Sequence, residues 1–542
     1  MSTYSSNEVA LINGVVVTLE PQLPRAEAIL IRDGRIAHVG KTLDVLHLKG
    51  PNCEAVDLEG RVVLPGLVES HMHPAMLGAS LLEVNCRHPE VRSIEDILSR
   101  VRERVKERPL GSWIVGGGYD DTKLEEKRHL TRWELDTVAP DHPVFIKRTC
   151  LHMGVANSKA LELAGVTSDT QDPEGGVIVR DAATGEPTGL LQEKAQDLLG
   201  IPPYSENEME QGLELALDRL ASYGITTVHE MSGTALGLRA YQNLLAEGRL
   251  TARIRLWLMA LPALGFEGLL PHVLGLGLKS GYGNDMLRFM GMKFVLDGAI
   301  SGRTAAVEDG YVGEPHNKGV LYLDQGQLDK HVAECLKNGL RVAIHGIGER
   351  ALEQAIGSIE RATEVVPLDV IRRMRNRIEH YSLPTLDQIK RTKEVGLLAG
   401  VSVAFIHSLG DSQRAALGPE RMKRLYPCRT LADLGVPFAA NSDCPVCDSN
   451  PFRGIHSAVT RTTESGQILD NVQNLTVEEA IAAYTTQAAY FALEEDLYGT
   501  LRPGKLGDLV VLPGNPYEMS PEAIKDLKVE MTFVGGHKVY PK

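Results

Sequence analysis

Two histidines separated by one residue are the side chains in this sequence best placed to do chemistry. They are His71 and His73, in the stretch "VVLPGLVESHMHP" at residues 62–74. In an extended segment, residues i and i+2 point to the same side, so the two imidazoles could be aimed at one point. Imidazole nitrogen is a preferred ligand of zinc. The pair is equally compatible with two solvated loop histidines, so the rest of the chain must decide between these interpretations.

Eight short apolar runs are candidates for the strands that would position such a site. In chain order they are "RVVLPG", "GITTVHEM", "RIRLWLMA", "FMGMKFVLDG", "RVAIHGIG", "RIEHYSL", "GLLAGVSV" and "VPFAANSD". Helical stretches such as 94–107 and 207–223 separate most of them. Eight β/α units are the number that closes a barrel, so the sequence predicts an α/β protein built on a TIM-like (β/α)8 barrel.

The two ends of the chain carry β-rich sequence of a different kind. Residues 1–64 alternate short apolar runs with Asn-Gly, Asp-Gly and Glu-Gly turns, and similar runs recur in residues 489–542. We expect these ends to form the two halves of a small β-sandwich, with the barrel at residues 65–488 between them. The interval between the first two candidate strands is too long for one helix, so we expect an inserted subdomain at about 75–223.

Polar residues gather at the predicted strand ends, which is where (β/α)8 barrels carry their function. His71 and His73 follow the first candidate strand. Four further candidate ligands or bridges belong to later strands: Lys293, His345, His380 and Asp443. A random scatter of the 17 histidines in the chain would not favour the polar ends of buried strands so consistently. The set therefore favours a metal site over solvated loop histidines.

With these motifs in place, the sequence resembles the amidohydrolase superfamily and, more narrowly, its YtcJ-like branch, amidohydrolase family 3. The resemblance covers nearly the whole chain. It is carried by "LPGLVESHMHP", "GGGYDD", "LHMGVANSKAL", "GLLQEKA", "GITTVHEM", "GMKFVLDGAISGRTA", "AIHGIGERAL", "RIEHYS", "ANSDCPV" and "GTLRPGKLGDLVVL". Two positions depart from the family pattern, because Glu69 and Glu349 stand where relatives usually have aspartate. Both departures keep the carboxylate.

The resemblance implies a binuclear metal centre, for which we expect two divalent ions, zinc above all. His71, His73 and Asp443 would hold the more buried ion. His345 and His380 would hold the second ion.

The resemblance also implies that a carboxylated lysine bridges the two ions, and Lys293 matches its position. An ammonium would be repelled by two cations, whereas a carbamate derived from CO2 supplies two anionic oxygens. A salt-bridged lysine is the alternative. Zinc lowers the pKa of a bound water to about 7, which makes hydroxide available at neutral pH. Asp443 could take the proton from this hydroxide and deliver it to the leaving nitrogen. A purely structural ligand is its alternative role.

The predicted function is hydrolysis of a carbon–nitrogen bond in a small amide, N-acyl, N-formyl or cyclic amide compound by a metal-bound hydroxide. An ester, lactone or phosphoester hydrolase is the alternative enzyme, and a non-catalytic scaffold is the third hypothesis. For substrate binding we expect His152, His229 and Arg303, with Asp120 and Asp121 as weaker candidates.

The composition of the chain limits the classes of partner that it is expected to bind. A net charge of −14 argues against nucleic acid and anionic membranes, and no apolar run is long enough to span a bilayer. Seven irregularly spaced cysteines fit a reducing cytoplasm, and the first twenty residues lack the features of a signal peptide. We therefore expect a cytoplasmic enzyme with a small-molecule substrate. The resemblance also suggests a homodimer.

Overall fold

The computed structural model describes residues 8–148 and 153–542. The chain divides into two compact units. One consists of Met1–Ala75 together with Ala216–Lys542, and the other is Met76–Leu215. Within the described ranges, no helix has the length and apolar character needed to cross a membrane.

The first unit is built around an eight-stranded, all-parallel sheet that is nearly closed into a barrel. Its strands in spatial order are β8 (Leu67–Met72), β15 (Ile225–Gly233), β16 (Arg253–Met259), β17 (Leu287–Val295), β18 (Val342–Gly346), β19 (Arg377–His380), β20 (Leu398–Val401) and β21 (Phe438–Ala440). Nearly every residue of these strands is buried, as expected for parallel strands covered on both faces. The predicted (β/α)8 barrel is confirmed.

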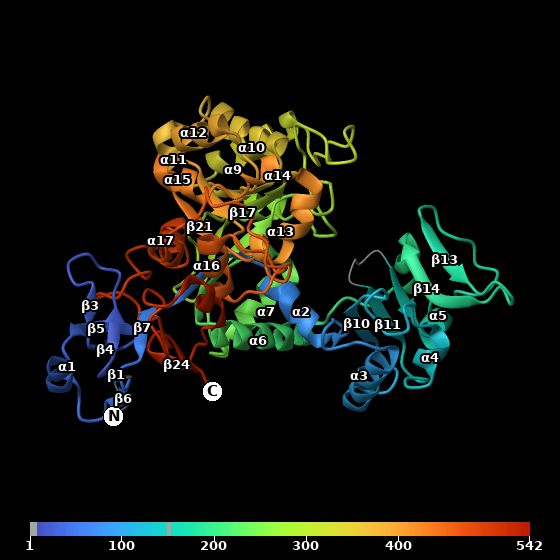
Figure 1. Ribbon diagram of the computed structural model, residues 1–542, viewed down its shortest axis with the longest axis horizontal. Helices are drawn as coiled ribbons and strands as arrows, with labels where there is room; N and C mark the ends of the chain where they lie inside the picture. Colours follow the sequence, from blue (N-terminus) through green and yellow to red (C-terminus); the bar gives the residue numbers. More distant parts are fainter. Residues whose placement is uncertain (1–7, 149–152) are drawn as a thin grey trace. The chain divides into compact units, whose positions relative to one another are not determined.

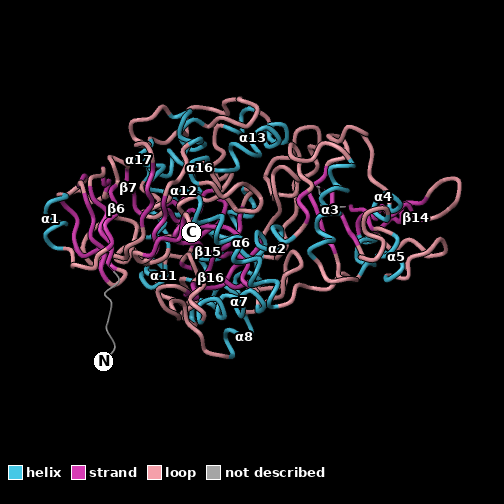
Figure 2. Tube along the Cα trace, turned by 90° about the horizontal axis from the view of Figure 1, so that it is seen from below, coloured by secondary structure: helices cyan, strands magenta, loops and turns pink. Residues whose placement is uncertain are grey.

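Helices cover the outside of the barrel, as α7 and α11 do in Figure 2. Those of this unit that follow barrel strands are α7 (Ala235–Ala246), α8 (Leu270–Gly275), α9 (Gln325–Lys337), α10 (Glu349–Ala362), α11 (Leu368–Met374), α12 (Leu386–Val395), α13 (Ala404–Leu417), α14 (Pro419–Met422), α15 (Cys428–Leu434), α16 (Pro451–Thr460), α17 (Val477–Ala483) and α18 (Thr486–Phe491). Local sequence fixes several of their starts. Asp324 begins α9 and Thr385 begins α12 with capping boxes, in which side chain and backbone satisfy each other's hydrogen bonds.

The first barrel strand differs from the predicted one. The run "RVVLPG" forms β7 (Val62–Pro65), which pairs with β2 (Val15–Val17) and β22 (Leu509–Leu512) outside the barrel. The barrel begins at β8, so His71 lies within the strand rather than after it. Gly66 separates β7 from β8, and a Cβ there would lie 2.2 Å from Oγ1 of Thr226. Close packing against β15 thus requires glycine where the chain passes from one sheet to the other.

Strands from both ends of the chain form two further sheets. The four-stranded sheet contains β5 (Arg35–Gly40), β4 (Ala28–Arg32), β1 (Glu8–Ile12) and β6 (Glu54–Asp57). The six-stranded sheet contains β24 (His537–Tyr540), β23 (Met531–Val534), β22 (Leu509–Leu512), β7, β2 (Val15–Val17) and β3 (Arg25–Ala26). Residues from both sheets, such as Ile29 and Val511, share one apolar core. Figure 1 shows the blue strands of this region around β7; α1 (Thr42–Leu48) flanks them, and η2 (Pro521–Asp526) lies on the C-terminal segment.

The second unit contains one mixed sheet with short helices (Figure 1). Its strands in spatial order are β13 (Gly176–Arg180), β14 (Pro187–Glu193), β12 (Met153–Ala156), β11 (Val144–Arg148), β10 (Ile114–Tyr119) and β9 (Val84–Asn85). Its helical elements are α3 (Ile94–Glu107), α4 (Arg132–Asp136), α5 (Ser158–Leu163) and η1 (Lys194–Leu199). The chain enters this unit within α2 (Pro74–Leu82) and leaves it within α6 (Glu206–Ser222).

Charged side chains are buried among the barrel strands. Arg255 pairs with Glu494 and Arg377 pairs with Glu379, and all four side chains are at most 2% exposed. Burying a charge is costly unless it is paired and hydrogen-bonded. Paired charges inside a barrel therefore indicate a role beyond filling space.

Candidate metal centre

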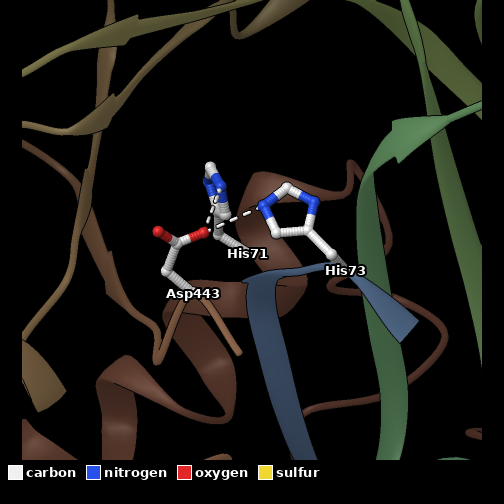
Figure 3. Close-up of side chains that lie close together, drawn as sticks. All are labelled: His71, His73 and Asp443. Carbon is white, nitrogen blue, oxygen red and sulfur yellow. Dashed lines mark hydrogen bonds and ion pairs between the residues drawn. The ribbon is translucent and has the colours of Figure 1, made fainter. Parts of the chain in front are cut away.

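Three side chains from opposite ends of the chain meet at the carboxyl ends of β8 and β21. Oδ1 of Asp443 lies 3.2 Å from Nε2 of His71 and 3.0 Å from Nε2 of His73. One ligand atom from each residue fits within a group no more than 4.8 Å across. Figure 3 shows both imidazoles directed at this one carboxylate. Two nitrogens and an oxygen at this spacing form a suitable donor set for a divalent metal ion.

The local backbone brings these groups together. The backbone N–H of His73 donates to the carbonyl oxygen of Cys444 at 2.8 Å. Asp443 has a φ of +54°, a left-handed conformation that non-glycine residues seldom adopt. The conformation is consistent with strain at a functional position, where the surrounding structure must hold it.

The hydrogen bonds around His71 and His73 leave Nε2 of each ring directed at Asp443, and Nε2 of His73 is hydrogen-bonded to Oδ1 of Asp443 at 3.0 Å. Nδ1 of His71 lies 2.5 Å from a Glu379 oxygen, which as a carboxylate can only accept. Nδ1 of His73 lies 2.8 Å from Oγ of Ser232, whose own hydroxyl is 3.1 Å from Glu230. The hydroxyl of Ser232 can therefore accept a proton from Nδ1 of His73, while Nε2 of each ring faces Asp443.

Nε2 of His71 is an orphaned polar atom in this arrangement. It is buried and has no hydrogen-bond partner. Burial also lowers the pKa of His71, so that the ring is neutral at neutral pH. A neutral imidazole with a buried, unused lone pair is what a metal ion requires, and the residues present therefore fit the ion that the sequence predicts.

His380 and His345 lie beside this group. The ring centroid of His380 is 4.6 Å from that of His71 and 4.3 Å from that of His345. His380 is the last residue of β19, and its φ of +68° breaks the alternation of the strand. Its Nδ1 lies 3.0 Å from Oγ of Ser402, which donates to Asn441 at 2.8 Å, so its Nε2 is again the free nitrogen.

His345 has the opposite arrangement of nitrogens. Its Nε2 lies 3.2 Å from the carbonyl oxygen of Gly298, an acceptor, and 3.3 Å from Oδ1 of Asp297. Nε2 therefore carries the proton, and Nδ1 is the nitrogen left for a ligand. The carboxylate of Asp297 is itself fixed by the backbone N–H groups of Ile347 and Gly348.

Lys293 lies on β17 and is 3% exposed. Burial lowers its pKa to about 8, although the charges of Glu379 and Asp443 act in the opposite direction. Its amine forms no ion pair with any carboxylate of the described ranges.

Glu69 occupies one of the two positions that depart from the family pattern. It is fully buried on β8 and accepts hydrogen bonds from the backbone N–H groups of His71 (3.3 Å) and Ser442 (3.1 Å). Burial raises its pKa to about 8, so it is protonated at neutral pH. Its structural effect is to join the end of β8 to the segment that carries Asp443.

The structure describes two of the three residues predicted to contact substrate, His229 and Arg303. His229 is fully buried on β15, with Nδ1 accepting from Arg377 at 3.0 Å. Arg303 pairs with Glu314 on the loop after β17. His152 lies outside the described residues.

The two weaker candidates belong to the second unit. Asp121 accepts from Arg148 at 2.6 Å and Asp120 accepts from the same arginine at 3.1 Å. Their carboxylates are thus engaged in local ion pairs. The second departure, Glu349, begins α10 and pairs with Arg424 at 2.6 Å.

Sequence reasoning missed Arg377 and Glu379, which lie directly against the histidine group. Their spacing in "RIEH" was an available signal, because residues i and i+2 of a strand share a face. Two opposite charges on one face of a buried strand point to a paired interior network. The hydroxyls of Ser232 and Ser402 carried no comparable signal.

A family model, two related proteins and a solved structure all relate this chain to hydrolases. The model of the amidohydrolase family matches residues 54–540. YtcJ of Bacillus subtilis, named as an amidohydrolase, is 31% identical over 98% of this chain and 98% of its own. N-substituted formamide deformylase of Arthrobacter pascens is 28% identical over 98% of this chain and 97% of its own. The crystal structure of a metal-dependent hydrolase from Pyrococcus furiosus aligns with a TM-score of 0.78 and 28% identity, covering 94% of this chain and 100% of its own.

Proposed function

This chain belongs to the amidohydrolase family, and from that premise we propose that it hydrolyses a carbon–nitrogen bond of a small amide, N-acyl, N-formyl or cyclic amide compound. The family and the class of enzyme predicted from the sequence are confirmed. The bond, the substrate and the number of metal ions are our proposal. Similarity to a formamide deformylase supports an amide as the substrate class.

One observation carries the proposal. Nε2 of His71, Nε2 of His73 and Oδ1 of Asp443 converge at 3.0–3.2 Å, while Glu379 and Ser232 engage the other nitrogen of each ring. In the described structure, Nε2 of His71 has no hydrogen-bond partner, and the partner of Nε2 of His73 is Asp443 itself. We assign the more buried ion to this group.

His345 and His380 would hold the second ion, and a carboxylated Lys293 would be a ligand shared by the two ions. The neighbouring rings and the unpaired, buried amine of Lys293 support this assignment. Zinc is the expected ion, since nitrogen and oxygen donors of this kind suit it, although such donors also accept other divalent metals. When bound, the ions supply Lewis acidity that polarises a carbonyl group and lowers the pKa of a water.

The residues of the chain then have separate tasks. The histidines hold their donor atoms in fixed orientations, because the other nitrogen of each ring is engaged elsewhere. Asp443 is positioned to receive a proton on its carboxylate and to return it to the leaving nitrogen. Its Oδ2 lies 4.0 Å from Nδ1 of His380, so this oxygen is oriented toward the second pair of histidines.

The six cysteines of the described ranges are all free thiols. Free thiols support the further proposal that the enzyme works in the reducing cytoplasm. A small molecule remains the proposed partner, and a homodimer the proposed assembly.

The proposal is tested by assaying the zinc-, manganese- or cobalt-loaded protein in bicarbonate buffer against a panel of N-formyl amines, N-acyl amino acids and cyclic amides. The panel also contains matched esters and lactones. We expect hydrolysis of at least one amide, abolished by chelator and by His71→Asn. Hydrolysis of esters or lactones alone would replace the proposed bond with the alternative one. A metal-loaded protein inactive on every compound would contradict the proposal.

A further inference from the structure

The carboxylate of Glu379 lies directly against His71. It is fully buried on β19, and its Oε2 is 2.5 Å from Nδ1 of His71. Buried carboxylates seldom occur without a charged partner. Here the partner is Arg377, whose Nη2 donates to the same oxygen at 2.9 Å and whose Nε donates to Oε1.

Arg377 is itself fixed from several directions. Its Nη2 donates to the carbonyl oxygen of Ser70 at 2.8 Å, and its Nη1 donates to Nδ1 of His229 at 3.0 Å. One guanidinium group therefore links β8, β15 and β19 beneath the histidines. This rigid fork is a geometry that a lysine could not reproduce.

Aromatic rings complete the enclosure of this group. The guanidinium carbon of Arg377 lies 4.8 Å from the ring centroid of Phe491 and 5.6 Å from that of Trp257. Both rings belong to buried residues. Arg377 has little freedom to move, and the oxygens of Glu379 are held with it.

The position of the proton on His71 follows from these contacts. An ionised carboxylate can only accept, so Nδ1 of His71 must donate to Glu379. The lone pair then lies on Nε2, which points to Oδ1 of Asp443 at 3.2 Å. The opposite tautomer would direct an N–H at the place of the metal.

We propose that Glu379 is a positioning residue, held by Arg377, which fixes the proton of His71 on Nδ1 and thereby sets the affinity of the His71–His73–Asp443 group for its metal ion. The inference rests on the proposed function, because it concerns the same metal. Outer partners of metal-binding histidines generally fix the tautomer and orientation of the ring.

The test compares two buried carboxylates by the same substitution. Glu379→Gln keeps the shape but removes the charge that requires an N–H donor from His71. Glu494→Gln is the matched control, because Glu494 is 2% exposed and pairs with Arg255 and Arg288 at 2.5 Å each, without contacting a histidine. The readout is the affinity for Zn²⁺, measured by competition with a chromogenic chelator.

We expect Glu379→Gln to weaken zinc affinity by about 10–100-fold, and Glu494→Gln to leave it within about twofold of the wild type. Equal affinities of wild type and Glu379→Gln would overturn the proposal. So would an equal loss in both variants, since that would show a general effect of disturbing the interior charges. Should Glu379→Gln fail to fold, Glu379→Asp keeps the charge, and we expect a smaller loss of affinity from its shorter reach.

A second measurement needs no substitution at Glu379 and no metal. Nitrogen-15 NMR of the histidine-labelled, metal-free wild type distinguishes the two tautomers. We expect the His71 resonance, assigned by its loss in His71→Gln, to report a proton on Nδ1. A proton on Nε2 would overturn the positioning role. Failure of the wild type to bind any divalent ion would instead contradict the proposed function. The NMR result would then test only whether Glu379 fixes the proton of His71 on Nδ1.

Discussion

The backbone N–H of Asp443 donates to the carbonyl oxygen of His71 at 3.0 Å. This bond joins the end of the first barrel strand, β8, to the segment after the last, β21, where regular strand pairing between the two is absent from the described sheet. The contact that closes the barrel therefore also brings the candidate metal ligands together. A substitution that separates these segments should affect both together.

Asp443→Asn tests the proposed proton transfer. Asparagine retains an oxygen ligand but cannot accept a proton, so we expect kcat for the best amide of the panel to fall by about 100–10,000-fold. Metal content should change far less than kcat. Asp411→Asn is the control. Asp411 lies on the outer helix α13 and accepts hydrogen bonds from the hydroxyls of Thr463 and Ser465 in a loop. A kcat for Asp443→Asn close to that of the wild type would assign the aspartate a structural role only.

Lys293→Met and Lys293→Glu form a pair that tests the bridge. Methionine removes the nitrogen that would carry the carbamate, so the metal content should fall from near two ions per chain to about one or fewer. Glutamate supplies a carboxylate in the same cavity and should restore part of the lost metal. Elemental analysis of both variants in bicarbonate buffer checks this, and full occupancy in Lys293→Met would contradict the bridging role.

Asp508→Asn tests how the C-terminal sheet is fastened to the barrel. Asp508 accepts from Nε and Nη2 of Arg253 at 2.6 and 2.8 Å, and both side chains are buried. Removing one partner leaves an uncompensated buried charge, and we expect the free energy of unfolding to fall by about 3–5 kcal/mol. The control is Asp369→Asn, in an exposed pair with Arg373 on α11, with an expected effect of about 0.5 kcal/mol or less. Urea unfolding curves giving equal effects for the two would contradict this account.

Arg391→Met tests a pH-dependent contribution on the outside of the barrel. Arg391 on α12 donates to Glu353 of α10, and this hydrogen bond is the main cause that lowers the pKa of Glu353 from 4.5. A carboxyl group whose pKa is lower in the folded than in the unfolded protein stabilises the fold at pH values above the unfolded-state pKa of 4.5. This stabilisation is lost as the pH falls through the pKa of the folded state. Because Glu353 is half exposed, we expect about 1 kcal/mol or less at neutral pH. The difference in Tm between Arg391→Met and the wild type should shrink below pH 4.5; a difference that grows on acidification would be the wrong sign.

The sequence was sufficient for the barrel because parallel, fully buried strands leave a clear apolar signal. It was not sufficient for its first strand. Val62–Pro65 and Leu67–Met72 are both buried, and only long-range pairing assigns the former to β2 and β22 and the latter to β15. Local pattern carries no information on which sheet a short apolar run joins.

The candidate site shows the same limit at the level of single residues. His71, His73 and Asp443 could be brought together from sequence because strand ends share one face of a barrel. The interior position of His229 could not be predicted from the sequence, because it depends on the register within β15 and on the contact with Arg377. The inward turn of His380 depends on its positive φ, which no motif encodes.

Elemental analysis of the wild-type protein, purified without chelator in bicarbonate buffer, shows whether the chain carries the proposed metal centre. We expect close to two divalent ions per chain, falling to about one or fewer in His71→Asn. No bound ion in the wild type, even after reconstitution, would contradict the metal-dependent hydrolase and favour a non-catalytic scaffold.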